Sequence, residues 1–269
     1  MHLLSGSGEV VAQAERAAAL LAALAAACVG CQHAEQRASY LPDAVWHDYK
    51  NFYSHENAQS LAIAFGSAGM SANSMMDRDI QEWYRHRAAS EWTHGYAKIT
   101  ENLGNGMLVV PAMAAASGLS FASDEGALGT VGQWGERSLR AYAVGGPFLL
   151  LSQEAVGGER PKDGDSYWRP FNNCHGVSGH AFIGAVPFIT IAEMTDSAPI
   201  KVVSYAGSAA VAWARMDRDA HFFSQVFIGW YIAKCSVDSV FRTELRPKPI
   251  ELVPILDDRT AGAALRFNF

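Results

Sequence analysis

The sequence has few charged residues and few cysteines, and both shortages exclude classes of protein. Only 18% of its 269 residues are charged, and 21 Lys and Arg against 27 Asp and Glu give a formal charge of −6. No basic run occurs, so the electrostatic footprint of a nucleic-acid-binding protein is missing. The four cysteines do not form a pair of CxxC motifs, which argues against a zinc site.

Long apolar runs are scarce as well. A membrane span needs about 20 mostly apolar residues, so the uncharged stretches of the sequence are compared with that length. Four internal stretches lack charged side chains: Asn57–Met76, Asn102–Ser123, Pro170–Ala192 and Val202–Ala214. The first three contain Ser, Asn, Gln, His, Gly or Pro at many positions, and the fourth is short. We therefore expect all four to contribute buried core helices to a soluble domain.

The N-terminus differs from the rest of the chain. Arg16 is followed by Ala17–Ala27, almost all Ala and Leu, and then by Cys28-Val29-Gly30-Cys31. A basic residue, a short apolar run and small residues in that order are typical of an export signal. A cysteine after small residues is typical of a bacterial lipoprotein processing site, here Cys31 or Cys28. We expect residues 1–31 to be such a leader; an Ala-rich surface helix is the alternative.

The remaining residues, 32–269, read as a single helical domain. Gln32–Tyr53 looks like an irregular opening segment, and the tail looks like a hairpin in which Ile250–Ile255 and Ala263–Phe269 flank Asp257-Asp258-Arg259. The helices are expected at Ala58–Ser71, Arg78–Arg87, Leu108–Ser117, Ala127–Ala155 (bent near Gly145-Gly146-Pro147), Ser178–Glu193, Ile200–Met216 and Ala220–Val237. The expected fold class is an all-α bundle with a small C-terminal β-hairpin.

Three polar clusters fall at the ends of these helices. They are Gly157-Gly158-Glu159-Arg160-Pro161, His175-Gly176-Val177-Ser178-Gly179-His180, and Arg215 with His221 and Gln225. Free N–H groups of Ser178 and Gly179 at a helix start would bind an anion. Arg160 and Arg215 would add charge-assisted bonds to a phosphate. Of the imidazoles of His180 and His221, one can attack phosphorus while the other protonates the leaving oxygen.

Together these residues resemble the superfamily of type 2 phosphatidic acid phosphatases, bacterial acid phosphatases and vanadium haloperoxidases. Its pattern is K-x6-R-P, then P-S-G-H, then S-R-x5-H-x3-D. Here the second motif reads Val177-Ser178-Gly179-His180, and the third reads Ala214-Arg215, His221 and Gln225 at the same spacing. The resemblance covers about residues 138–239 and implies a helical bundle of that type.

The first motif fits in two registers. Arg160-Pro161 follows a long helix, as the arginine of the family does, and this register places Gln153 at the lysine position. We prefer it, although Lys162 and Arg169 match the literal spacing and stay as second choices for holding phosphate. Gln225 is the most serious departure, because the family's aspartate orients the nucleophilic histidine and offsets its positive charge. An amide can accept the same hydrogen bond but carries no charge.

The resemblance implies a phosphatase for phosphomonoesters, including lipid phosphates, that works through a phosphohistidine on His221. His180 would be the general acid, and neither metal nor cofactor would be needed. The enzyme alternative is a haloperoxidase holding vanadate in the same place. The non-enzyme alternative is a degenerate envelope lipoprotein that binds phosphate or lipid headgroups. We expect a periplasmic or cell-envelope protein, held to the membrane by a lipid anchor, with no nucleic-acid partner.

Overall fold

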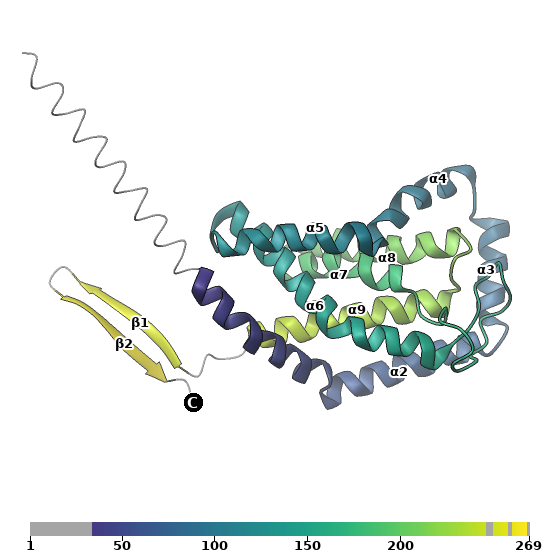
Figure 1. Cartoon of the computed structure of the whole chain (residues 1–269). Helices are drawn as coiled ribbons and strands as arrows, with labels where there is room; N and C mark the ends of the chain where they lie inside the picture. Colours follow the sequence, from purple (N-terminus) through teal and green to yellow (C-terminus); the bar gives the residue numbers. More distant parts are fainter. Residues whose placement is uncertain (1–33, 246–249, 258–259, 268–269) are drawn as a thin grey trace, which may run out of the picture.

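The computed structural model describes residues 34–245, 250–257 and 260–267 and shows a bundle of helices (Figure 1). Residues 34–52 are helical. The elements that follow are α2 (His55–Ala72), α3 (Met76–Arg87), α4 (Glu91–Thr100), the 3-10 turn η1 (Glu101–Gly104), α5 (Gly106–Gly118), the 3-10 turn η2 (Leu119–Phe121), α6 (Gly126–Val156), α7 (Gly179–Glu193), α8 (Ala198–Asp217) and α9 (Phe223–Glu244). The predicted leader, with Cys28 and Cys31, lies outside the described residues.

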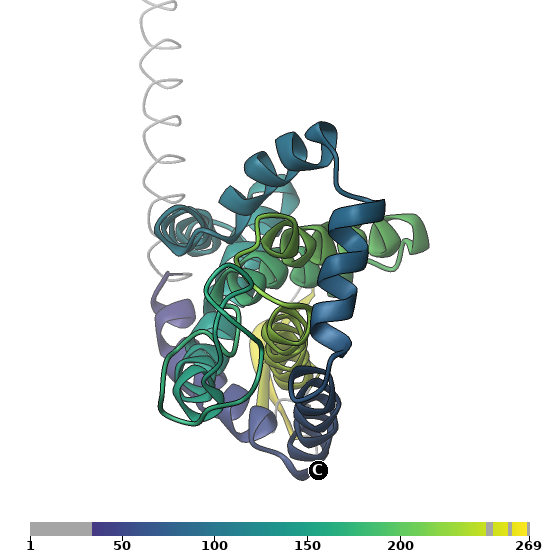
Figure 2. The same ribbon diagram turned by 90° about the vertical axis from the view of Figure 1, so that its right-hand side faces the viewer.

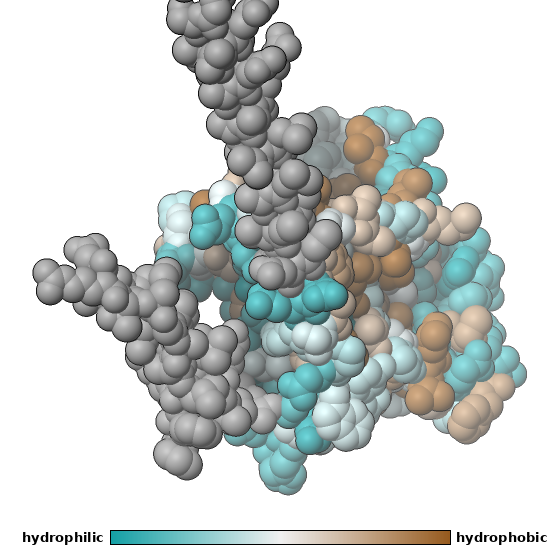
Figure 3. All heavy atoms as spheres, turned by 60° about the vertical axis from the view of Figure 1, so that its left-hand side comes forward, coloured by the Kyte–Doolittle hydropathy of each residue, from teal (hydrophilic) through white to brown (hydrophobic). Residues whose placement is uncertain are grey.

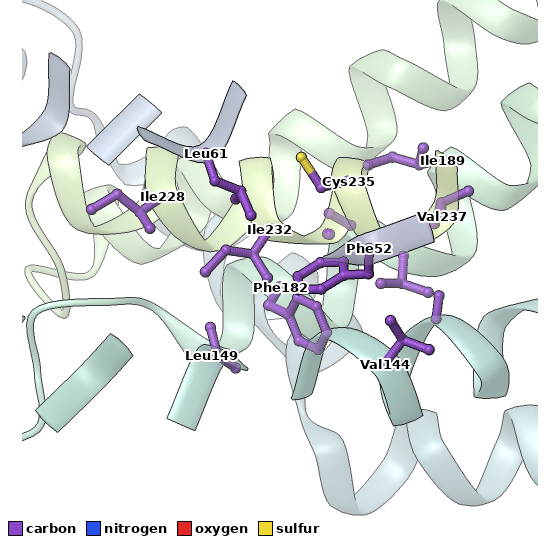
Figure 4. Close-up of a cluster of buried hydrophobic side chains, with 14 of the residues drawn as sticks. Phe52, Leu61, Val144, Leu149, Phe182, Ile189, Ile228, Ile232, Cys235 and Val237 are labelled. Carbon is purple, nitrogen blue, oxygen red and sulfur yellow. The ribbon is translucent and has the colours of Figure 1, made fainter. Parts of the chain in front are cut away.

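Helix α7 forms the centre of the bundle because almost every position on it is apolar or small. It contacts α6, α8 and α9, and the two ribbon views show it enclosed by them (Figures 1 and 2). Phe182 and Ile189 of α7 join Val144 and Leu149 of α6 and Ile232 of α9 in one buried cluster (Figure 4). Each such side chain contributes about 1.5–3 kcal/mol through burial. The core therefore fixes α6, α7 and α9 relative to one another.

The opening segment is a helix, so its prediction as irregular chain was wrong. Ala44, Asp48 and Phe52 are all essentially fully buried and recur every four residues, which is one face of a helix. The middle member of this set is an aspartate, and its charge masks the apolar periodicity in the sequence. A buried partner of Asp48 explains how a charged residue can lie on this face.

That partner is Arg140, in the middle of α6. Its Nε donates to Asp48 Oδ2 at 2.8 Å, its Nη2 donates to Asp48 Oδ1 at 2.9 Å, and its Nη1 donates to Glu244 at the end of α9. Burial acts to lower the pKa of Arg140, but the hydrogen bonds and charge of Asp48 and the charge of Glu244 raise it above its ordinary value. We refer to these three residues as the Arg140 cluster; it ties the first described helix to α6 and α9.

Helix α5 departs most from prediction, since the sequence indicated a buried core helix at Leu108–Ser117. Its only buried residues are Met113 and Ser117, whereas Met107 and Leu108 are 86% and 57% exposed. One side of α5 packs closely on α6, where an added Cβ on Gly135 would lie 2.5 Å from the Ser117 nitrogen. The other side is turned outward along the edge of the bundle (Figure 1).

Helix α4 was not predicted, because it has few apolar residues, two of them aromatic, interspersed with polar ones. A reciprocal capping box starts it: Ser90 Oγ accepts from the Thr93 N–H, and Thr93 Oγ1 accepts from the Ser90 N–H. A 53° bend then separates the continuous stretch Glu91–Gly104 from Gly106–Phe121. This bent pair together meets the length and composition of a membrane span, whereas no single helix among the described residues does so.

Beyond α9, β1 (Ile250–Asp257) and β2 (Thr260–Phe267) pair antiparallel, with Ile250 opposite Phe267 and Asp257 opposite Thr260.

Of the two cysteines in the described part of the chain, Cys174 is exposed and Cys235 is buried, and both are free thiols. The face of the bundle in Figure 3 mixes hydrophilic and hydrophobic residues.

Candidate functional site

The three polar clusters meet where α6 ends and α7 and α9 begin. The Ser178 N–H at the start of α7 donates to the Gln225 carbonyl in the first turn of α9 at 3.0 Å. The Gln225 side chain in turn donates to the Glu159 carbonyl, in the loop after α6, at 2.8 Å. The three motifs are therefore joined by direct hydrogen bonds, and we call Arg160, Gly179, His180, Arg215, His221 and Gln225 the candidate site.

Local backbone conformation explains how the chain reaches this point. Gly157 and Gly158 end α6 with φ of 64° and 109°, a region that residues with a side chain rarely adopt. A Cβ on Gly229 of α9 would lie 2.3 Å from the Ser178 carbonyl, so only glycine allows this approach. Glycine at these positions lets the loop and the two helix starts come together.

His221 is held in one tautomer by Gln225. Gln225 Oε1 accepts from the Phe222 N–H at 3.1 Å, while its Nε2 donates to the Glu159 carbonyl. These two backbone bonds fix the amide orientation, so the 3.0 Å contact between Oε1 and His221 Nδ1 requires Nδ1 to be the donor. The lone pair of a neutral His221 is consequently on Nε2.

His221 stays neutral at ordinary pH. It is only 5% exposed, and burial lowers its pKa to about 3. The hydrogen bond to Gln225 acts in the opposite direction, while the charges of Arg215 and Arg160 lower the pKa further. An unprotonated imidazole with a free Nε2 lone pair is a nucleophile.

His180 shares this electrostatic environment from the first turn of α7. Its pKa is lowered by burial and by the charges of Arg215 and Arg160, while Glu101 raises it. Because the same two guanidiniums act on both imidazoles, Arg160, Arg215, His180 and His221 lie around one region of the protein. That arrangement presents two cations and two imidazoles to an anion.

Both arginines have an unused donor. The Nε atoms of Arg160 and Arg215 are buried from solvent, and neither has a hydrogen-bond partner. A buried donor without a partner costs about 1–3 kcal/mol, more for a charged group. Such groups in a folded protein are completed by a ligand, an ion or a bound water.

The N–H of Ser178 does not play the part predicted for it. Since it donates to the Gln225 carbonyl, it is unavailable to an anion, and Ser178 Oγ caps α7 by accepting from the Ala181 N–H. The N–H groups of Gly179 and His180 are then the first donors at the start of α7. Gln153 lies beside them, with its Nε2 donating to the Val177 carbonyl at 2.9 Å.

The two second-choice cations lie elsewhere. Lys162 is exposed, and Arg169 Nη2 donates to Asp165 Oδ2 at 2.8 Å. That bond and the charge of Asp165 raise the pKa of Arg169. Neither side chain is among the groups that shift the pKa of His180 or His221. Arg160 is therefore the cation of the first motif that the structure brings to the two imidazoles.

Sequence reasoning missed Glu101. Its Oε2 accepts from Arg215 Nη1 at 2.9 Å, and its Oε1 lies 3.8 Å from Arg218 Nε. Glu101 is the only carboxylate between Glu91 and Asp124, in a stretch that is otherwise almost uncharged. That isolation is the one signal the sequence offers, because Glu101 belongs to none of the three motifs.

Helices α3 and α4 hold the turn between Arg215 and His221 in place. Gln81 Nε2 donates to the Met216 carbonyl at 2.9 Å, and the Tyr84 hydroxyl donates to Asp217 Oδ1 at 2.6 Å. The other carboxylate oxygen of Asp217 lies 2.8 Å from His94 Nδ1. The hydrogen bond to Asp217 and its charge raise the pKa of His94. Both helices thus fix the geometry of the candidate site without entering it.

No protein-family model and no curated protein matches the sequence. Among solved structures, the fold is similar to that of the first transmembrane PAP2 type phosphatidylglycerolphosphate phosphatase from Bacillus subtilis. The TM-score is 0.46 and the sequence identity is 12%, over 77% of this chain and 96% of that one.

Proposed function

We propose that this protein is a phosphatase that hydrolyses phosphomonoesters with His221 as the nucleophile. The observation that carries the proposal is the Gln225–His221 pair beside Arg160 and Arg215. It combines a neutral imidazole with a fixed Nδ1–H and buried guanidinium donors that have no partner. The bundle then belongs to the acid phosphatase type that the three motifs resemble.

In the first half-reaction, Nε2 of His221 forms a bond to phosphorus while the ester P–O bond breaks. His180, as the imidazolium that the negative charge of the bound phosphate favours, donates its proton to the departing alkoxide, so the alcohol leaves neutral and His180 becomes the neutral base of the next step. The guanidiniums of Arg160 and Arg215 and the N–H groups of Gly179 and His180 hold the equatorial oxygens, whose charge builds up in the transition state.

In the second half-reaction, water attacks the phosphohistidine and His180 takes a proton from it. The P–N bond breaks, inorganic phosphate departs and Nε2 regains its lone pair. Gln225 keeps the Nδ1 proton in place throughout, but it offers no charge to the imidazolium that the covalent intermediate contains. We therefore expect turnover to be slow compared with an enzyme that has a carboxylate at this position.

The test is phosphate release from para-nitrophenyl phosphate and from phosphatidic acid in mixed micelles, measured for the wild type and His221→Ala. Acid-labile and base-stable ³²P on the protein identifies the phosphohistidine. His86→Ala, an exposed histidine on α3, is the matched control and should retain activity. Loss of turnover in His221→Ala alone supports the proposal.

Other outcomes point to the alternatives. Phosphate binding without turnover in the wild type indicates a binding protein. Oxidation of bromide by hydrogen peroxide after addition of vanadate indicates a haloperoxidase. Equal turnover in the wild type and His221→Ala removes His221 from the mechanism.

A further inference from the structure

An exposed apolar face runs along α4, η1 and the start of α5. Trp92, Tyr96, Ile99, Leu103 and Met107 are 75%, 46%, 72%, 47% and 86% exposed. The spacing of four, three and four residues from Trp92 to Leu103 places these four on one side of a helical path, and Met107 follows after the bend. Together with Leu108 we call them the α4–α5 face. The opposite side of the same path is buried, at Ala97, Thr100 and Gly104.

This composition is unusual for a surface in contact with water. Large apolar side chains that follow one another along an exposed helix mark a contact with a partner or with a membrane. The α4–η1 and α5–η2 pair is also the stretch whose length and composition match a bent membrane segment. It follows one edge of the bundle, as the two ribbon views show (Figures 1 and 2).

The side chains favour a lipid surface as the occupant. Trp and Tyr concentrate at the level of lipid headgroups, and cations beside them attract anionic lipids. Lys98 of α4 is exposed, and the side chain of Arg218, whose Nε lies 3.8 Å from Glu101 of η1, is 42% exposed. The carboxylate of Glu101 faces Arg215 and Arg218, so it is bound within the protein.

The start of the described chain lies at the same edge. Arg37 donates to Asp124 Oδ1, just beyond η2, at 3.0 Å and to Glu136 Oε2 of α6 at 2.6 Å. The described chain therefore begins near the end of α5 that lies away from Trp92, and the predicted lipid attachment sites Cys28 and Cys31 precede it in the sequence. A lipid on either cysteine would hold this edge near a bilayer.

We propose that the α4–α5 face rests on a lipid bilayer that contains anionic phospholipid. This goes beyond the proposed function, because it assigns a membrane-contact surface irrespective of catalysis. It also explains the position of the candidate site: a Cβ on Gly104 of η1 would lie 2.6 Å from the His180 carbonyl, and Glu101 of η1 binds Arg215. The element that touches the membrane is then the element that borders the site.

The experiment uses the full chain with Cys28→Ser and Cys31→Ser, so that no lipid is attached. Its sedimentation is measured with vesicles of roughly three parts phosphatidylcholine to one part phosphatidylglycerol. The test variant carries Trp92→Ser, Ile99→Ser and Met107→Ser. The control carries Ile63→Ser, Leu151→Ser and Val203→Ser, whose side chains are equally exposed, at 71%, 69% and 71%, on α2, α6 and α8.

We expect the test variant to partition onto vesicles at least about tenfold more weakly than the parent, since three apolar side chains no longer leave water. The control should match the parent. Brominated lipid should quench the parent's tryptophan fluorescence, and the Trp92→Phe variant should lose that quenching.

Equal partitioning of the test and control variants would overturn the proposal, as would a parent that does not bind vesicles. A test variant that changes only the oligomeric state in size-exclusion chromatography would assign the face to protein contact. Vesicle binding is measured without turnover, so a failed proposal of phosphatase activity would leave this result unaffected.

Discussion

Two buried clusters of charged residues in this protein differ in how their guanidinium groups are paired. In the Arg140 cluster, a guanidinium meets carboxylates on two sides, and Asp48 binds it through both oxygens. In the candidate site, Arg160 and Arg215 each retain a buried Nε without a partner, and the imidazole of His221 faces an amide. The guanidinium of the first cluster is paired with carboxylates on two sides, whereas the second cluster retains two buried donors that can bind a ligand.

The difference shows how one fold separates stability from function. Both clusters lie along α6, where sixteen residues, or about 24 Å of helix, separate Arg140 from the end at Val156. A paired cluster holds helices together, and its loss should unfold the protein. An unpaired cluster contributes little to folding, and its loss should affect binding and turnover.

Asp48→Ala is expected to produce the largest effect on stability. It leaves Arg140 buried without its bidentate partner, which should lower the free energy of unfolding by about 3–5 kcal/mol. Urea denaturation followed by circular dichroism measures this change. Glu35→Ala, an exposed carboxylate on the same helix, should change stability by less than about 0.5 kcal/mol. Similar results for the two variants would mean that the Arg140 cluster does not stabilise the fold.

Arg215→Ala should reduce activity strongly and stability little, which is the reverse of the result expected for Asp48→Ala. Removing a donor to the transferring phosphoryl group should lower kcat/KM by about 100- to 1000-fold, with a change in unfolding free energy of about 1 kcal/mol or less. Arg218→Ala, which also removes a cation near Glu101, is the control for general electrostatics. If Arg215→Ala unfolds the protein while Arg218→Ala does not, the contrast between the two clusters disappears.

Gln225→Asp sharpens the comparison by giving the candidate site a carboxylate like that of the Arg140 cluster. The charge should stabilise the imidazolium that develops on His221, raising kcat about tenfold with little change in KM. It should also raise the pKa of His221 from about 3, which NMR titration detects without any turnover. Gln225→Glu, of equal length, tests whether reach limits the effect. An unchanged His221 pKa in both variants contradicts the prediction.

Stability should depend on pH through His221. Its pKa is about 3 in the folded protein and about 6.5 in the unfolded chain, so the unfolded chain binds the proton more readily between these values. The free energy of unfolding should therefore fall as pH drops below about 6.5, by up to about 1.4 kcal/mol per pH unit from this group. Urea titrations at several pH values should show a shallower slope for His221→Asn, and an unchanged slope would exclude this residue.

Glu101→Gln is expected to have the smallest effect. Without the carboxylate, Arg215 is released to an anion, and inorganic phosphate should bind a few-fold more tightly in calorimetry. The pKa of His180 should also fall, because Glu101 is the group that raises it. Glu91→Gln, on the exposed first turn of α4, should change neither quantity. Weaker phosphate binding in Glu101→Gln would show that Glu101 orients Arg215 rather than competing for it.

Helix positions could be predicted wherever apolar periodicity and stop signals agreed. The helices expected at Ala127–Ala155 and Ser178–Glu193 correspond closely to α6 and α7, because Gly157-Gly158 and the Ser178 cap mark their ends. Helix 34–52 and α5 were misread for opposite reasons. The charge of Asp48 suggested an exposed position although the residue is buried, and the uncharged sequence of α5 suggested a buried helix although one side of it is exposed.

Within the candidate site, residue spacing indicated which side chains gather, since Arg215 lies in the last turn of α8, His221 in the short connection and Gln225 in the first turn of α9. Spacing does not reveal hydrogen bonds between distant segments. Two hydrogen bonds of the site join segments far apart in the sequence. The Ser178 N–H donates to the Gln225 carbonyl, and Arg215 donates to the Glu101 carboxylate. Such contacts depend on packing between helices and have no local signature.

The docking of α2 on α9 has a consequence for synthesis of the chain. Asn57 Nδ2 donates to Ser239 Oγ at 3.0 Å, and the two residues are 182 positions apart. At ribosomal speeds of about 5–20 residues per second, α2 waits roughly 10–40 s for its partner. During this interval Leu61, Ala64 and Ala68, which the finished core buries, have no α9 to cover them. Folding of this bundle is therefore expected to finish only after α9 has been synthesised, and nascent chains should bind holdase chaperones until α9 has emerged.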